Sequence, residues 1–320
     1  MSKELMWAYL IHLTNNIGGD FAPGDGGQCI KDVPLKCEKK VWTETIDYLH
    51  SKNCCNAILI DVGDGVEYDS HPEIKVPGAW TKTELADEIA RIRSMGFKVY
   101  PKLNFSACHD KWMGVYSRML STPQYYQFCK DVIDELSELF DKPEYFHLGL
   151  DEECISTQEN SHMCIIRGFD MYWHDAHYLF KLVEERGARP WMWADHIWHN
   201  PKSRDAFVEK ASKDVLYSNW YYGNWEHTGG WLYDSLKAYE VLEKHGFDQI
   251  PCGSTTIASE YCHDNMKLTV ENCTKTIAPE RLHGFLMTSW AKTTSEGKEK
   301  LFEQADAMAE AHDYYCKKVD

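Results

Sequence analysis

The amino-acid sequence predicts a single (β/α)₈ barrel, and three observations carry this prediction. Short apolar runs alternate with amphipathic segments along the whole 320-residue chain. Eight such pairs over this length fit a closed barrel better than an open doubly wound sheet. No phosphate-binding glycine motif follows the first apolar run, as a nucleotide-binding open sheet would require. We therefore expect that residues 1–320 form one domain, the (β/α)₈ barrel.

Each expected strand is a short apolar run, and each expected helix repeats its apolar residues with a period near 3.6. The run 56–62, Asn-Ala-Ile-Leu-Ile-Asp-Val, is typical of a strand buried on both faces. The expected strands are 5–13, 56–62, 97–105, 145–150, 190–195, 215–219, 249–254 and 284–290. The expected helices are 41–52, 83–95, 122–140, 169–186, 201–212, 233–245, 260–273 and 297–316. Gly96 and Gly187 directly follow two of these helices, as helix-ending glycines do.

Long loops follow several of the expected strands, which places them on the face where barrel enzymes build their active sites. These loops are 14–40, 63–80, 106–121, 151–168 and 220–231. The first contains a glycine-rich run, Gly18, Gly19, Gly24, Gly26 and Gly27. That run precedes no helix directly, so it lacks the context of a phosphate-binding loop.

The charge balance argues against nucleic acid and membrane surfaces as partners. The chain has 34 Lys and Arg against 50 Asp and Glu, a formal charge of −16, which repels phosphates and anionic lipids. No apolar stretch has the length of a membrane helix, and the first residues lack the apolar core of a secretion signal. The 12 cysteines form no C-x-x-C pair, so we expect reduced thiols and a cytoplasmic location. The sequence leaves the oligomeric state open.

Aromatic residues indicate a ligand with apolar ring faces. The chain has 12 Trp, 18 Tyr and 12 Phe, and many of the tryptophans fall near the ends of expected strands. Indole faces in such positions suit sugar rings, so a carbohydrate is the expected substrate.

The densest acidic cluster, Asp151-Glu152-Glu153, directly follows the fourth expected strand. Adjacent carboxylates at the end of a barrel strand can push each other's pKa apart, which leaves one as an acid and the other ionised. A solvated acidic turn is the alternative interpretation, since the chain contains 50 acidic residues.

Around this cluster the sequence resembles glycoside hydrolase family 20, the β-N-acetylhexosaminidases. The segment 147–152, His-Leu-Gly-Leu-Asp-Glu, is similar to the His-x-Gly-Gly-Asp-Glu signature at the end of that family's fourth strand. The segment 101–109 resembles the family's Pro-Glu-Ile-Asp-x-Pro-Gly-His on strand three. Trp193-Ala194-Asp195 and Trp290 match its strand-five region and its strand-eight tryptophan.

This resemblance implies a retaining hydrolysis in which the 2-acetamido oxygen of the substrate attacks the anomeric carbon. Glu152 would be the general acid and then the base, and Asp151 would stay ionised and stabilise the oxazolinium, while its charge raises the pKa of Glu152. The implied substrate pocket would be formed by Trp193, Trp220 and Trp290, by Tyr221 or Tyr222, and by Asn104, His109, Asp195 and Lys292. His109 is expected to hydrogen-bond a neighbouring acid. No cofactor and no metal are implied.

The sequence also departs from the family pattern at sugar-recognition positions. The first strand ends without the family's arginine, and Lys292 stands where the family has a glutamate. Lys102 and Asn104 replace the acidic pair of strand three, and Leu150 replaces the second glycine of the signature. Because Lys292 and Lys102 are cations, we expect an anionic group on the sugar or a changed contact to its 4-hydroxyl.

Two other functions remain open from the sequence. His196 and His199, with Asp61, Asp151 and Glu152, would form the metal site of a sugar isomerase or epimerase. Against this, the seventh and eighth strands end without metal-ligand side chains. A catalytically silent barrel that binds glycans through its tryptophans is the other alternative.

Overall fold

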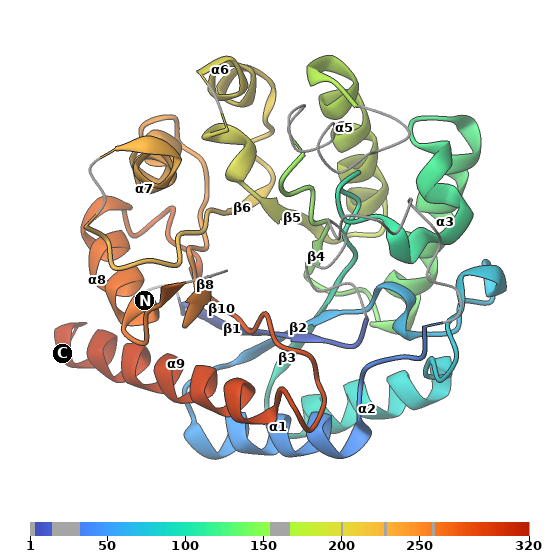
Figure 1. The fold of residues 1–320 in the computed structure, drawn as a ribbon. Coiled ribbons are helices and arrows are strands. Elements are labelled where there is room, and N and C mark those ends of the chain that lie inside the picture. The colour runs from blue at the N-terminus through green and yellow to red at the C-terminus, as the bar shows by residue number, and fades with distance from the viewer. Residues whose placement is uncertain are drawn as a thin grey trace.

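The computed structural model describes residues 4–14, 33–153, 167–199, 201–226, 229–257 and 260–319. Eight parallel strands form one sheet in the order β6-β5-β4-β3-β2-β1-β10-β7. Backbone pairing of Tyr217 with Gln249 and of Trp220 with Cys252 joins the β6 and β7 edges. The sheet therefore closes on itself, with helices around it (Figure 1), and the predicted (β/α)₈ barrel is confirmed.

All eight barrel strands lie within the predicted runs or start one residue before them. Their residues are almost entirely buried, because strands of a barrel face side chains on the inside and helices on the outside. The strands are β1 (Met6–His12), β2 (Ala57–Asp61), β3 (Lys98–Lys102), β4 (Tyr145–His147), β5 (Arg189–Trp193), β6 (Leu216–Ser218), β7 (Cys252–Gly253) and β10 (Gly284–Thr288).

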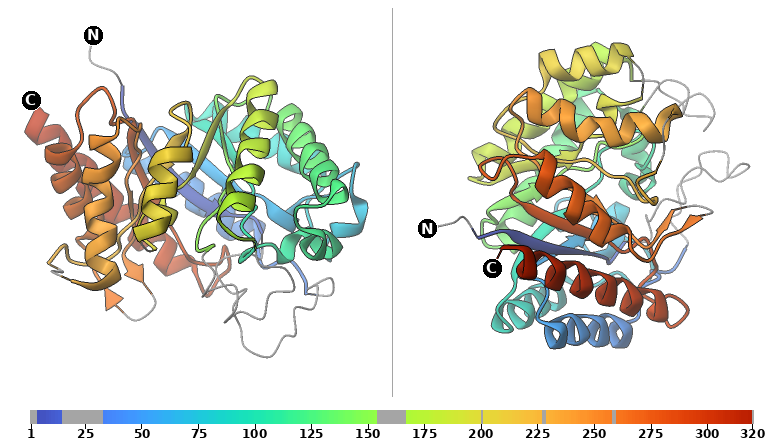
Figure 2. Two further views of the ribbon diagram at one scale, coloured as in Figure 1. Left: turned by 90° about the horizontal axis from the view of Figure 1, so that it is seen from above. Right: turned by 90° about the vertical axis from the view of Figure 1, so that its left-hand side faces the viewer.

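The helices cover the outside of the barrel, as both views in Figure 2 show. They are α1 (Lys39–Lys52), α2 (Lys82–Ser94), α3 (Pro123–Leu139), α5 (Phe169–Glu185), α6 (Pro201–Lys210), α7 (Gly230–Lys244), α8 (Asn265–Thr276) and α9 (Lys298–Val319). Short 3₁₀ segments interrupt the loops at Gly63–Gly65, Pro72–Ile74, Lys111–Met119 and Asp195–Ile197. None of the helices in the described part of the chain is long and apolar enough to cross a bilayer.

One predicted helix begins later than expected. Instead of a helix from residue 260, β8 (Thr256–Ile257) pairs antiparallel with β9 (Glu260–Tyr261), and α8 starts at Asn265. The buried Asn265 side chain accepts a hydrogen bond from the Ser254 amide at 3.0 Å and donates to the carbonyls of Tyr221 and Gly223 at 2.9 and 2.7 Å. These long-range bonds fix the start of α8, and helical periodicity carries no information about them.

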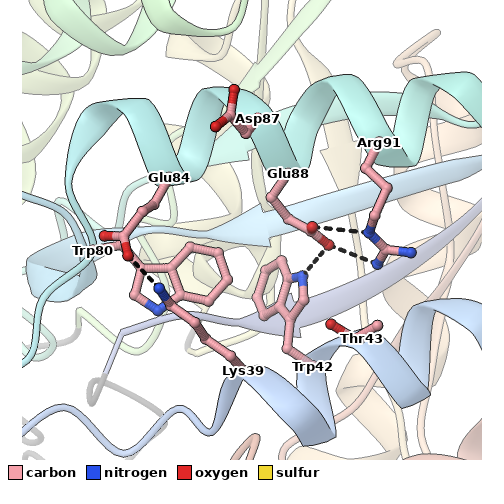
Figure 3. Close-up of a pocket in the computed structure, with 8 residues that line it drawn as sticks. All are labelled: Lys39, Trp42, Thr43, Trp80, Glu84, Asp87, Glu88 and Arg91. Carbon is pink, nitrogen blue, oxygen red and sulfur yellow. Dashed lines mark hydrogen bonds and ion pairs between the residues drawn. The ribbon is translucent and has the colours of Figure 1, made fainter.

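A pocket on the outer wall of the barrel lies between α1 and α2 (Figure 3). It is lined by Lys39, Trp42, Thr43, Trp80, Glu84, Asp87, Glu88 and Arg91. Most of its charged groups are paired with one another: Glu88 accepts hydrogen bonds from Trp42 Nε1 and Arg91 Nη2, both at 2.7 Å, and Lys39 binds Glu84. We call this the outer pocket. All of its lining residues except Trp80, which ends the loop after β2, come from α1 and α2.

Candidate active site

The loops that follow β3, β4 and β5 bring five of the predicted site residues together. β3 and β4 pair through Lys102 and His147, and the Phe105 amide continues this pairing by donating to the Leu148 carbonyl at 3.0 Å. The residues brought together at these strand ends are Asn104, His109, Asp151, Glu152 and Asp195.

The loop after β4 has an unusual backbone that places its two carboxylates. Gly149, Leu150 and Glu152 have φ angles of +69°, +68° and +56°, in the left-handed region. A Cβ on Gly149 would lie 2.1 Å from Asn104 Oδ1, so only glycine fits there. Leu150 keeps the left-handed conformation where the family signature has glycine, at a cost that is typical of functional loops.

Asp151 lies at the bottom of the site, with 7 % of its surface exposed. Its carboxylate accepts a hydrogen bond from Asn104 Nδ2 at 2.7 Å and lies 3.4 Å from His109 Nε2. Burial raises the pKa of Asp151 to about 6, and the charges of Asp195 and Glu152 add to the shift. The sequence led us to expect an ionised Asp151, and this remains a prediction. Its pKa is raised because the carboxylate has lost most of its contact with water.

Glu152 is more exposed and is held by its backbone. Its side chain is 38 % exposed, and Oε2 lies 3.1 Å from His109 Nε2. Its amide donates to Asp195 Oδ2 at 2.7 Å. The predicted contact of His109 with a neighbouring acid is therefore present, and it reaches both members of the pair.

Asp195 acts on Glu152 through the backbone in this structure. The carboxylate is fully buried, and the same Oδ2 atom that accepts the Glu152 amide also lies 2.7 Å from His199 Nε2. Its other oxygen, Oδ1, has no hydrogen-bond partner among the described residues. The substrate contact expected for Asp195 remains a prediction.

Four of the predicted aromatic residues pack against one another in two pairs. The rings of Trp193 and Trp290 lie 6.2 Å apart, and Tyr222 stacks on Trp220 at 5.4 Å. Tyr222 lies beside Trp290, and burial raises the pKa of its hydroxyl well above the usual value, with a further contribution from the charge of Asp151. Tyr222 thus connects the aromatic residues to the acidic pair.

Tyr221 differs from its neighbour in its surroundings. Its ring lies against Trp225 with the centroids 5.8 Å apart. The sequence left open which of the two tyrosines belongs to the pocket, and the choice remains a prediction.

The two lysines expected to bind an anionic sugar have different environments. Lys102 is buried, and its Nζ lies 2.7 Å from Asp61 Oδ2, which also lies 3.1 Å from His12 Nδ1. Asp61 therefore compensates the Lys102 charge, and the expected second cation of the pocket is already paired. Lys292 is exposed, and its contact with a substrate remains a prediction.

The residues of the alternative metal site have separate partners. Asp61 is bound to Lys102 and His12, and His199 contacts Asp195. His196 stacks on Tyr172 at 4.3 Å, and burial lowers its pKa to about 4. Within the described ranges, the group whose ligand atoms lie close enough for a metal is His109, Asp151 and Glu152, all within 4.8 Å of one another. His109 did not belong to the set proposed from the sequence.

Sequence reasoning missed Arg167. It is buried against Glu153 and lies near the end of the expected loop 151–168 but outside any motif, so no local signal points to it. The glycine-rich run at Gly18 to Gly27 lies outside the described residues.

Comparison with solved structures shows a shared fold at low identity. An exo-β-N-acetylglucosaminidase from Vibrio harveyi is 14 % identical with a TM-score of 0.62, and the match covers 100 % of this chain and 57 % of that one. The β-N-acetylhexosaminidase of Bacteroides fragilis is 16 % identical over 99 % and 70 % of the two chains, with a TM-score of 0.64. A Streptomyces plicatus β-hexosaminidase variant in complex with the product GlcNAc is 13 % identical over 96 % and 64 %, also with a TM-score of 0.64.

The chain thus spans between about half and three quarters of the length of these three proteins. No curated protein sequence matches it. The model of the glycosyl hydrolase family 20 catalytic domain matches residues 69–311, which is most of the chain and includes the acidic pair and the aromatic residues around it. The chain therefore belongs to glycosyl hydrolase family 20.

Proposed function

We propose that this protein hydrolyses β-glycosides of 2-acetamido sugars, with the acetamido oxygen of the substrate as the nucleophile. The observation that carries the proposal is the arrangement of Asp151 and Glu152. They are adjacent, one is buried and the other partly exposed, and both lie within reach of His109. The similar proteins from Vibrio harveyi and Bacteroides fragilis are named as enzymes of this class, which supports the proposal.

Glu152 is the proposed general acid and base. Its exposed carboxyl group is able to reach a leaving-group oxygen, while the Asp195 contact holds its backbone in place. His109 donates to, or accepts from, the same carboxyl group at 3.1 Å, so the imidazole orients it.

Asp151 is the proposed stabiliser of the cationic oxazolinium intermediate. A carboxylate in a buried site acts strongly on a developing positive charge, because little water screens the interaction. Asn104 holds Asp151 Oδ1 at 2.7 Å, which leaves Oδ2 to face His109 and the substrate. Trp193, Trp290 and Tyr222 are proposed to enclose the acetamido group beside it.

The test is Glu152→Gln, assayed on aryl β-N-acetylglucosaminides and β-N-acetylgalactosaminides. Turnover should fall by roughly 10² to 10⁴ on phenyl glycosides, whose leaving group needs a proton. The loss should be much smaller on 2,4-dinitrophenyl glycosides, whose leaving group departs unprotonated. Equal losses on both would remove Glu152 from this role. Binding of these glycosides without any hydrolysis by the wild type would support a glycan-binding barrel instead.

A metal-dependent isomerase or epimerase is the second candidate, because His109, Asp151 and Glu152 have ligand atoms within 4.8 Å of one another. We expect prolonged chelator treatment to leave glycoside hydrolysis unchanged. Loss of activity that only Mn²⁺, Mg²⁺ or Co²⁺ restores would favour the metal-dependent reaction.

A further inference from the structure

The third acid of the cluster, Glu153, has no part in the proposed reaction, and its side chain is fully buried. It is bound by Arg167, whose Nε and Nη2 donate to the two Glu153 oxygens at 2.5 Å each. A buried carboxylate needs such a partner, because an uncompensated charge in the interior is very costly.

Arg167 joins segments that are far apart in the sequence. Its guanidinium also donates to Asp175 Oδ2 in α5 at 3.0 Å and to the Phe105 carbonyl after β3 at 3.0 Å. A longer contact of 3.5 Å reaches the Tyr125 hydroxyl in α3. All five N–H groups of the arginine are thus directed at protein acceptors, and a lysine ammonium at this position cannot span them.

Glu153 in turn holds the loop that carries His109. Its Oε2 atom accepts the Ala107 amide at 2.9 Å, two residues before His109. The next bonds run between the same two loops: Ser106 Oγ donates to the Asp151 carbonyl at 2.6 Å, and Cys108 Sγ donates to the Glu152 carbonyl at 3.4 Å. The loop after β3 and the loop after β4 are therefore tied together directly behind the acidic pair.

We propose that Arg167, with Glu153 and Asp175, is a positioning clamp that sets the distance between His109 and the carboxyl group of Glu152. We call these three residues the Arg167 clamp. The proposal rests on the proposed function, because it assigns to the clamp the orientation of the general acid. The clamp residues touch no substrate in this proposal. They act through the backbone of the two loops that carry His109 and Glu152.

The test compares Arg167→Lys with a matched control, Arg91→Lys in the outer pocket, where an arginine also binds a glutamate through two nitrogens (Figure 3). With a misplaced general acid, kcat on the phenyl glycoside should fall about 10²-fold, since a misplacement of about 1 Å costs that much. The loss on the 2,4-dinitrophenyl glycoside should stay below about tenfold, with KM within about threefold on both substrates. Arg91→Lys should change neither kcat nor KM on either substrate.

Circular dichroism and thermal unfolding establish that each variant is folded. If Arg167→Lys does not fold, Glu153→Gln, which keeps the side-chain volume and one acceptor oxygen, takes its place with the same expected selectivity. Equal losses on the two glycosides, or no loss, would overturn the clamp. Glu152→Gln is assayed alongside. If it shows the leaving-group effect and the clamp variant does not, only the clamp fails. If Glu152→Gln lacks the effect, the role of Glu152 fails and the clamp with it.

Discussion

Asp151 shows at the scale of one residue how function and stability oppose each other. Its pKa of about 6 means that the fold binds a proton at this site more tightly than an unfolded chain does. Above pH 6 the carboxylate is ionised in a site that disfavours the charge, so it destabilises the fold. The proposed mechanism needs that same charge in order to stabilise the oxazolinium.

Asp151→Asn should therefore lose activity and gain stability. We expect kcat on 2-acetamido glycosides to fall by roughly 10² or more, because a neutral amide cannot stabilise the cation. The free energy of unfolding at pH 8 should rise by up to about 3 kcal/mol, the value of two pKa units. This gain should be complete above pH 6 and disappear toward pH 4, where the wild-type carboxyl becomes protonated in both states. Denaturant unfolding at several pH values measures it. A variant that is less stable than the wild type at pH 8 would contradict the shift.

The sequence predicted the strands well because the apolar pattern that indicates a strand is local. Runs such as 56–62 are apolar throughout, as both faces of a barrel strand require, and β2 lies inside that run. The start of α8 was predicted wrongly because it is determined by hydrogen bonds from Asn265 to Ser254 and Tyr221. These residues are close to Asn265 in space but distant along the chain. Arg167 was missed for the same reason, since its partners lie in α3, in α5 and in the loops after β3 and β4.

The candidate site could be predicted only in part. The pair Asp151 and Glu152 was found because it directly follows a strand within a short recognisable motif. The pairing of Lys102 with Asp61 was not found, because neighbouring strands set it and not the order of residues along the chain. The burial of Asp151, and with it the direction of its pKa shift, likewise depends on loops that fold over it.

The loop after β4 provides a prediction at the same scale. Gly149→Ala places a Cβ against Asn104, whereas Gly246→Ala, at a similar φ of +72°, meets nothing within 4 Å. Both variants should pay about 1–2 kcal/mol for the left-handed backbone. Only Gly149→Ala should also displace Asn104 from Asp151 and lower kcat by about 10²-fold. Thermal unfolding and steady-state kinetics of both variants separate the two effects. Equal kinetics in the two variants would show that Asn104 does not hold Asp151 in a productive position.

For the whole molecule, the formal charge of −16 bears on which sugars can approach. The field of the protein disfavours an anionic substrate at low ionic strength. Of the two cations that the sequence placed near the sugar, Lys102 is already compensated by Asp61. Of these two cations, Lys292, which is exposed on the loop after β10, is the one left to contact an acidic sugar.

Lys292→Ala decides whether that residue recognises charge. If Lys292 contacts an anionic group, the variant should raise KM about three- to tenfold for an acidic 2-acetamido glycoside, for example a 6-sulfated one, and less than twofold for the neutral parent. Because the side chain is exposed, the difference should shrink between 20 mM and 500 mM salt, where the screening length falls to a few ångströms. The same ratio of KM values in the variant and the wild type at low salt would leave Lys292 as a solvated surface residue. In that case the acidic glycoside should simply bind more weakly than the neutral one, since repulsion by the net charge would then act without a compensating contact.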